Sequence, residues 1–306
     1  MEATAPNCKS VSLVVAWFGT DLRAGNCQIR PGVDSPTKVT APKVWLVNGV
    51  ARAAAFVVSQ ISGSPAYGGT PSDFSVVQAI RELKARGFRV TFYPFLLMDV
   101  PAGNLLPNPY SNNSASTGQP KYPWRGRITC SPAAGFTGTV DKTAAAATQV
   151  SAFFGAATSA NFAVSGTTVS WTGSPTDWGL RRMMLHYAHL CVAAGGVDAF
   201  LIGSELRGLT QIRSGPSTYP AVEALQSLAV GCRSILGAGT KLSYAADWSE
   251  YFGHQPQDGT GDVFFHLDPL WADANTDFVG IDNNLSVALL SFTRPNHGPQ
   301  VPDFRA

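Results

Sequence analysis

Acidic residues follow three apolar segments of this chain. Glu205 follows FLIGS, Asp247 follows LSYAA, and Asp282 follows FVGI, while Glu250 comes just after Asp247. Short apolar runs of this kind are typical of strands that are buried on both faces, as in parallel sheets. The carboxyl ends of parallel strands gather at one edge of the sheet, where α/β barrels place their chemistry. We therefore expect these carboxylates to lie close together.

Clustered carboxylates suit the hydrolysis of glycosidic bonds. One carboxyl group must be a protonated acid that serves the leaving oxygen, and the other must be an ionised nucleophile or base. We take Glu205 as the candidate catalytic residue. Aromatic side chains at strand ends suit the stacking of sugar rings, although they suit a packed core equally well. The candidate substrate-binding residues are Trp17, Tyr93, Tyr244, Asp247, Trp248 and Asp282.

Structural roles explain the same residues as readily. Glu205 taken alone is as consistent with a helix-capping role or a salt bridge to Arg207 as with catalysis. Asp247 and Asp282 are more typical of structural positions, because Asp often caps the turn that follows a strand. Arg125 in YPWRGR could clamp an acidic sugar, but a solvated loop arginine is the default expectation.

The remaining motifs exclude several other chemistries. The chain has no GxSxG nucleophile elbow, no phosphate-binding P-loop and no dinucleotide fingerprint. Its five cysteines form no CxxC pair, and Cys27 and Cys130 could form a disulfide or remain thiols. His186 and His189 are three apart, a weak metal pattern, and one surface and one half-buried histidine is the favoured interpretation. We expect no metal site and no cofactor.

Composition restricts the class of protein further. The chain has 306 residues, of which 45% are hydrophobic and 14% charged, so it can bury a core. The net charge is +2 with no long Lys/Arg cluster, which argues against nucleic-acid binding. No apolar run is long enough to span a membrane. The first residues lack the basic and apolar regions of a secretory signal peptide.

The elements around the acids alternate between strand and helix. We expect strands at 11–18, 88–98, 199–204, 241–248 and 277–282, with a short edge strand at 44–47. We expect helices capped by Ser72, Asp141 and Asp177, and one opened by Pro220. A hairpin is expected at 161–172. This alternation predicts an α/β protein with a (β/α)8 TIM-barrel-like fold that is incomplete. Residues 99–177 form a long inserted segment over the barrel mouth.

Several blocks of the sequence resemble one family. VSLVVAWFG, RGFRVTFYPFLLMD, YPWRGRITC, GVDAFLIGSELRGLT and KLSYAADWSEY look like the TIM-barrel-like domain of gene transfer agent and phage tail proteins, the large baseplate or host-specificity proteins. The resemblance covers most of residues 8–284. It implies a glycoside hydrolase-like barrel in which the Glu of G-[ST]-E-L, here Glu205, is the acid/base.

The resemblance also sets the expected boundaries. By the family's register the chain holds about strands two to six of the barrel, and the later strand that carries the family's second Glu is absent. Residues 1–284 are the expected barrel domain, and residues 285–306 an atypical tail that reads as truncated or frameshifted. A barrel that lacks strands has open edges, so we expect marginal stability or self-association.

Two functions follow from the resemblance. The first is a tail-tip component that binds or cleaves a cell-envelope polysaccharide or peptidoglycan, made in the bacterial cytoplasm and assembled with other tail and baseplate proteins. The second is a non-catalytic structural or glycan-binding tail module. A cytosolic barrel enzyme with a phosphate substrate is a weaker alternative, because the late barrel loops that bind phosphate are missing.

Overall fold

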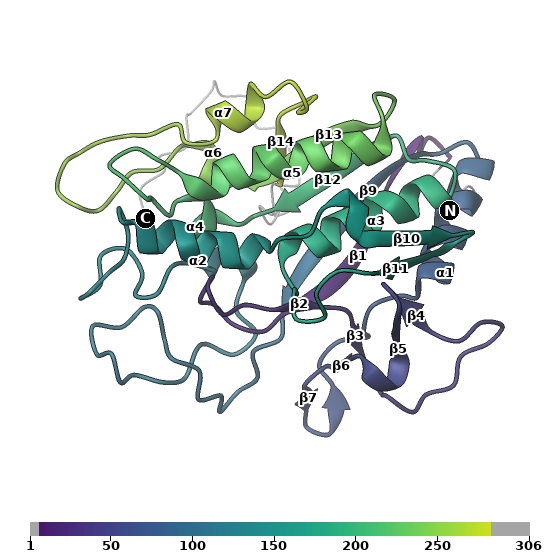
Figure 1. Ribbon diagram of the computed structural model, residues 1–306, viewed down its shortest axis with the longest axis horizontal. Helices are drawn as coiled ribbons and strands as arrows, with labels where there is room; N and C mark the ends of the chain where they lie inside the picture. The colour runs from purple at the N-terminus through teal and green to yellow at the C-terminus, as the bar shows by residue number, and fades with distance from the viewer. Residues whose placement is uncertain (1–5, 283–306) are drawn as a thin grey trace, which may run out of the picture.

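The structure is a computed structural model in which residues 6–282 are described (Figure 1). The expected tail at 285–306 lies outside the described residues. One six-stranded sheet organises the molecule, in the order β14-β13-β12-β9-β1-β2. Its strands are β1 (Ser10–Gly19), β2 (Ile29–Arg30), β9 (Arg89–Met98), β12 (Ala199–Ser204), β13 (Lys241–Asp247) and β14 (Gly280–Asp282).

Five of these strands are parallel and lie side by side in chain order. β1 and β9 pair along their whole lengths, from Ser10 opposite Arg89 to Gly19 opposite Met98. β12 pairs with β9 and β13, and β13 pairs with β14. Only the short β2 is antiparallel, against the end of β1. Chain order without reversal distinguishes a barrel-type sheet from a doubly wound one. The fold is therefore α/β and TIM-barrel-like, with five parallel strands described.

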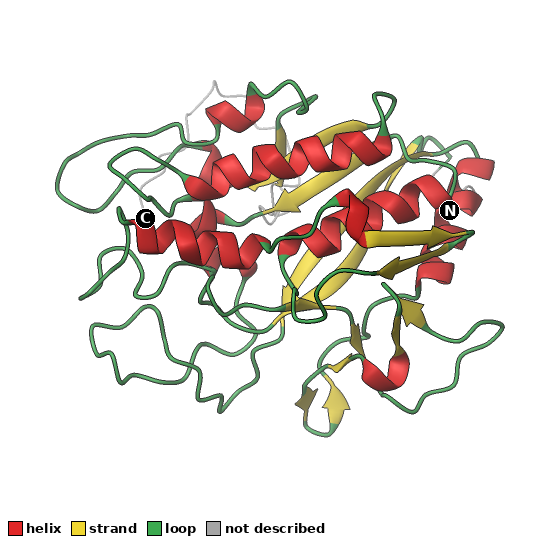
Figure 2. Ribbon diagram, viewed as in Figure 1, coloured by secondary structure: helices red, strands yellow, loops and turns green. Residues whose placement is uncertain are grey.

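Helices cover one face of this sheet. Figure 2 shows α3 and α5 lying across it, and neighbouring helices pack together in the order α1, α3, α5 and α7. The helices are α1 (Asp73–Ala85), α2 (Ala144–Phe154), α3 (Leu180–Ala193), α4 (Arg207–Thr210), α5 (Pro220–Leu236), α6 (Trp248–Tyr251) and α7 (Asp268–Trp271). None of the helices described in residues 6–282 combines the length and the apolar character that crossing a membrane requires.

Local signals explain two of the four expected helix starts. The Ser72 side chain accepts a hydrogen bond from Ser75 N and caps α1, and Pro220 opens α5, as predicted. The predicted cap by Asp141 is wrong, because Thr143 precedes α2 and Asp141 instead binds Arg213. The predicted cap of α3 by Asp177 is also wrong. Its side chain accepts hydrogen bonds from Ala156 N and Gly179 N, tying the end of α2 to the start of α3.

Short strand pairs and 3-10 turns fill the connections. The expected hairpin at 161–172 is present as β10 and β11. The edge strand expected at 44–47 is β4, which pairs with β5 rather than joining the main sheet. These elements are β3 (Gly32–Val33), β4 (Leu46–Val47), β5 (Val50–Ala51), β6 (Phe56–Val57), β7 (Gln60–Ile61), β8 (Ser64–Pro65), β10 (Phe162–Ser165), β11 (Thr168–Trp171), η1 (Arg52–Ala54), η2 (Arg125–Arg127) and η3 (Ser159–Asn161).

The two faces of the main sheet differ in burial. The helix-facing side belongs to a large buried core that includes Trp17, Phe92 and Phe200. The other side carries a small separate cluster made of Tyr93, Leu201 and Ala245, with Phe95 packed beside it. Alternation along a strand sends adjacent residues to opposite faces, which explains why Phe92 and Tyr93 belong to different clusters. The smaller cluster lines the concave side, next to the carboxyl ends of the strands.

Candidate functional site

Glu205 sits directly after a distortion in β12. The pairing with β13 shifts between Leu201 and Ser204, which marks an irregularity of the β-bulge type. Glu205 then adopts a left-handed backbone with φ of 47°, while its N–H donates to Ala245 O at 2.9 Å. A non-glycine residue in this region is strained, and such strain concentrates at functional sites. The bulge turns the Glu205 side chain toward the carboxyl edge of the sheet.

Two residues from the 99–177 segment hold this carboxylate. Trp124 Nε1 donates a hydrogen bond to Glu205 Oε2 at 2.5 Å, and Arg125 Nη2 forms an ion pair with the same oxygen at 3.0 Å. Arg125 Nε donates to Ser204 O at 3.0 Å, and its guanidinium lies 3.8 Å from the centre of the Phe95 ring. The expected salt bridge from Glu205 to Arg207 is therefore wrong, and so is the default expectation that Arg125 is solvated, because Arg125 is buried.

Gly208 allows the 99–177 segment to come this close. A Cβ on Gly208 would lie 2.7 Å from Ile128 O and 2.9 Å from Gly126 O. Only a glycine lets the start of α4 lie against the backbone of η2 at this distance. The contact places Trp124 and Arg125 over the end of β12, where they reach Glu205.

Asp282 at the end of β14 supplies a second carboxylate beside Glu205. Asp282 Oδ2 lies 4.0 Å from Arg125 Nη2 and accepts a hydrogen bond from Tyr93 Oη at 2.5 Å. Arg125 Nη2 is also the atom that pairs with Glu205 Oε2, so one guanidinium lies between the two carboxyl groups. Since Tyr93 projects from the concave face of the sheet, it fixes the Asp282 carboxylate at the edge where Glu205 emerges. Tyr93 thus orients an acidic group of the site.

The surroundings of Glu205 favour its protonated form. Burial raises the pKa of Glu205 above its usual range, and both the charge of Asp282 and its hydrogen bond raise it further. Arg125 and the hydrogen bond from Trp124 act in the opposite direction, but the net pKa shift is upward. The net shift lets Glu205 hold its proton to a higher pH than a solvent-exposed glutamate does.

Asp247 and Glu250 have structural contacts. Asp247 caps α6, accepting from Ser249 N at 2.9 Å, and Asp247 N donates to Glu250 Oε2 at 2.9 Å. Glu250 is buried and also accepts hydrogen bonds from Thr210 Oγ1 and Tyr244 Oη. Burial raises the pKa of Glu250 to about 7. Asp247 lines the open cavity beside Glu205 that is described below, whereas Glu250 does not line it.

Two predicted substrate-binding aromatics are corrected by their burial. Trp17 is 0% exposed and donates from Nε1 to Tyr187 Oη at 2.8 Å between the sheet and α3. Tyr244 is also 0% exposed, and its hydroxyl bridges Leu206 N and Glu250. Neither ring can stack on a ligand, because both point into the helix-facing core. The alternative role in a packed core is the correct one for this pair.

An open cavity lies beside Glu205, and we call it the proximal cavity. Its volume is about 870 Å³. The predicted substrate-binding residues Asp247 and Trp248 line it, and Trp248 is 45% exposed. The other lining residues include Tyr67, Tyr122, Trp124, Arg125 and Glu205 itself. Aromatic walls with a few convergent polar groups are typical of small-molecule sites.

No metal centre is found in the described part of the chain, residues 6–282. His186 is fully buried rather than half-exposed, and its Nε2 lies 2.9 Å from Asp73 Oδ1. His189 is partly buried, with its Nε2 3.3 Å from Ser159 O. Cys27 and Cys130 are free thiols. Burial raises the pKa of Cys27 to about 12 and that of Cys130 to about 11, so neither is a reactive thiolate.

Fold and site together define a TIM-barrel-like domain with a pair of acids at the carboxyl edge of its sheet. Residues 178–294 match the family model of the GTA TIM-barrel-like domain. This range includes Glu205 and Asp282 but is narrower than the resemblance over residues 8–284. A comparison with curated proteins finds no match.

Solved structures with a distant likeness are glycoside hydrolases. One is the GH113 beta-mannanase of Alicyclobacillus acidocaldarius in complex with ManMIm, at 13% identity and a TM-score of 0.36, covering 82% of this chain and 48% of that one. Another is a GH113 beta-1,4-mannanase complex, at 11% identity and a TM-score of 0.33, covering 79% of this chain and 46% of that one. The chain spans about half the length of these structures.

Proposed function

We propose that this domain cleaves a cell-envelope glycan, with Glu205 as the proton donor and Asp282 as the second carboxyl group of the site. The observation that carries the proposal is that one guanidinium joins the two carboxyl groups: Arg125 Nη2 lies 3.0 Å from Glu205 Oε2 and 4.0 Å from Asp282 Oδ2, and Glu205 lines the proximal cavity. A raised pKa at one carboxyl and an ionised neighbour are the two requirements of acid-assisted glycoside cleavage.

Each residue has a separate part in the proposed reaction. Glu205 protonates the glycosidic oxygen as the bond to the anomeric carbon breaks. Asp282, oriented by Tyr93, faces the cationic sugar that develops and either attacks it or stabilises it. In retaining glycosidases the two carboxyl groups are about 5 Å apart, with the scissile bond between them. Trp248 offers an exposed ring for stacking a sugar in the same cavity.

The biological setting is proposed from the family match. The family model of the GTA TIM-barrel-like domain covers residues 178–294, which include Glu205 and Asp282. A role at the tail tip of a phage or gene transfer agent, in contact with other baseplate proteins, would bring the site to a cell envelope. Mass spectrometry and immunogold labelling of purified particles test this setting. Particles that lack the chain would contradict it.

Turnover on a panel of peptidoglycan and bacterial polysaccharides tests the chemistry. We expect release of new reducing ends by the wild-type protein, with a loss of at least about 100-fold in Glu205→Gln and in Asp282→Asn. The matched control is Glu82→Gln, which removes an exposed carboxylate on α1. Turnover that persists in Glu205→Gln would contradict the assignment of Glu205 as the proton donor.

A binding module without catalysis is the second candidate. One observation favours it: Trp124 Nε1 and Arg125 Nη2 contact the same oxygen of Glu205, which restrains the carboxyl group. In this case the panel gives no turnover, but glycan binding persists in Glu205→Gln and weakens in Trp248→Ala. Isothermal titration calorimetry on the same panel separates the two functions.

A further inference from the structure

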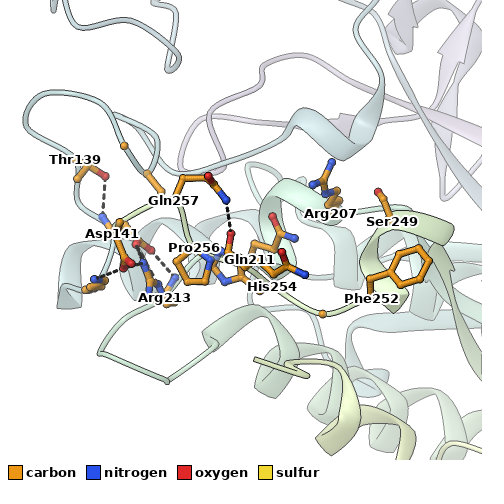
Figure 3. Close-up of a pocket in the computed structure, with 16 residues that line it drawn as sticks. Thr139, Asp141, Arg207, Gln211, Arg213, Ser249, Phe252, His254, Pro256 and Gln257 are labelled. Carbon is orange, nitrogen blue, oxygen red and sulfur yellow. Dashed lines mark hydrogen bonds and ion pairs between the residues drawn. The ribbon is translucent and has the colours of Figure 1, made fainter. Parts of the chain in front are cut away.

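A second cavity continues from the proximal one, and we call it the distal cavity. Its volume is about 750 Å³, and it is shown in Figure 3. Arg207 and Ser249 line both cavities. The residues that follow Asp247 form a shared wall, because Trp248 lines the proximal cavity and Phe252 lines the distal one. The two spaces therefore form one elongated groove with Arg207 at the junction.

Arg207 differs from the other cations of the distal cavity. Arg213 Nη2 is paired with Asp141 Oδ2 at 2.9 Å, and Lys142 Nζ with Asp258 Oδ2 at 2.7 Å. Within residues 6–282 the Arg207 guanidinium has no carboxylate partner, and no dashed line reaches it in Figure 3. Arg207 is also exposed to solvent. The junction thus carries a cation that forms no ion pair with a described residue.

The neighbouring residues leave this charge in place. His254 is neutral at pH 7, because burial, together with the charges of Arg213 and Arg207, lowers its pKa to about 4. Apart from the ion pairs, the distal cavity is lined in part by the uncharged amides of Gln211, Gln255 and Gln257. Amide side chains donate to and accept from hydroxyl groups, which suits sugars. Phe252 is 60% exposed and adds a second ring beside the groove.

We propose that the groove binds an extended anionic glycan, with Arg207 holding an acidic group of a sugar unit next to the one at Glu205. The inference rests on the proposed glycan function and adds the charge and minimum length of the substrate. A planar guanidinium pairs with a carboxylate through two parallel hydrogen bonds, which fixes the orientation of the sugar as well as its charge. Sugars beyond that unit occupy the distal cavity against Phe252 and the glutamine amides.

The test uses hexasaccharides from alginate, hyaluronan and polygalacturonate, each beside its carboxyl-reduced form. Reduction removes the charge and leaves the linkages intact. Calorimetry is expected to show that the wild-type protein binds at least one acidic hexasaccharide about tenfold more tightly than its reduced form. Arg207→Gln should lose this preference while binding the reduced form as the wild type does, and Arg207→Lys should keep part of it.

The matched control is Arg86→Gln, which removes an exposed arginine that is paired with Glu82 on α1, outside both cavities. It should retain the full preference for the acidic form. Equal binding of acidic and reduced forms by the wild-type protein, or an unchanged preference in Arg207→Gln, overturns the inference and leaves the proposed function standing. Absence of binding to all six sugars also overturns it, while turnover on the polysaccharide panel still decides the proposed function separately.

Discussion

The guanidinium of Arg125 lies 3.0 Å from the carboxylate of Glu205, and both side chains are almost completely buried. This ion pair joins the long 99–177 segment to the end of β12. A buried pair whose partner is removed leaves an uncompensated charge, which is strongly destabilising. The same contact opposes the effect of burial on the pKa of Glu205. Removing Arg125 should therefore change both the stability of the domain and the pKa of Glu205.

Arg125→Met is expected to raise the pKa of Glu205 further, because Arg125 lowers it in the wild-type protein. Carbon-13 NMR of the side-chain carboxyl groups measures the pKa, with the Glu205 signal assigned by its loss in Glu205→Gln. We also expect the free energy of unfolding to fall by about 3–5 kcal/mol in urea melts at pH 7. An unchanged Glu205 titration would falsify the assigned role of Arg125.

Asp282→Asn is expected to shift the same titration in the opposite direction. The charge of Asp282 raises the pKa of Glu205, so its removal lowers that pKa. If the protein hydrolyses a glycan, the alkaline limb of its pH–rate profile should move to lower pH in this variant, provided that residual activity is measurable. Glu82→Gln is the control and should leave the Glu205 titration in place. A shift in the same direction as in Arg125→Met contradicts the pairing.

Glu250 makes the stability of the fold depend on pH. Burial raises its pKa from 4.5 to about 7 in the folded protein. Between these values the folded state binds more protons than the unfolded state, so this residue lowers the free energy of unfolding as pH rises toward 7. Between pH 4.5 and pH 7.5, the free energy of unfolding of the wild type should fall by about 3 kcal/mol relative to that of Glu250→Gln. Urea melts of both proteins that change in parallel across this range would rule out the effect.

Tyr187→Phe tests the core behind the site. Trp17 Nε1 donates to Tyr187 Oη at 2.8 Å, and both residues are fully buried. The phenylalanine keeps the ring but leaves the indole N–H without its acceptor, at a cost of about 1–3 kcal/mol. Thermal and urea unfolding measure this loss. The matched comparison is Tyr251→Phe. Because Tyr251 is exposed, removing its hydroxyl should change the free energy of unfolding by less than about 0.5 kcal/mol.

Self-association follows from the apolar residues around β14, which lies at one edge of the described sheet. Phe278, Val279 and Ile281 are all exposed. Exposed apolar edge strands pair with other chains, and a charge on the edge opposes this. Sedimentation velocity should show concentration-dependent association that Ile281→Lys reduces. Steep urea melts that do not depend on protein concentration speak against this prediction.

Apolar runs were sufficient to predict the five parallel strands, and end signals predicted two of the four helix starts. The strand ending at Glu205, the cap at Ser72 and the helix opened by Pro220 all follow from residues close together in the chain. The predicted caps by Asp141 and Asp177 were wrong because each side chain binds a residue distant in the chain. Asp141 pairs with Arg213, and Asp177 accepts a hydrogen bond from Ala156 N. The G-[ST]-E-L pattern pointed to Glu205 but carried no signal for what surrounds it.

The partners of Glu205 were decided only by the tertiary structure. Trp124 and Arg125 come from a segment without regular periodicity, and Asp282 comes from a strand that is not adjacent to β12 in the sheet. The roles of Trp17 and Tyr93 also depended on the fold, because a strand that is apolar on both faces does not reveal which side meets the helices. Local sequence determines which residues form elements, since those interactions span a few residues. The packing of distant elements determines which side chains meet.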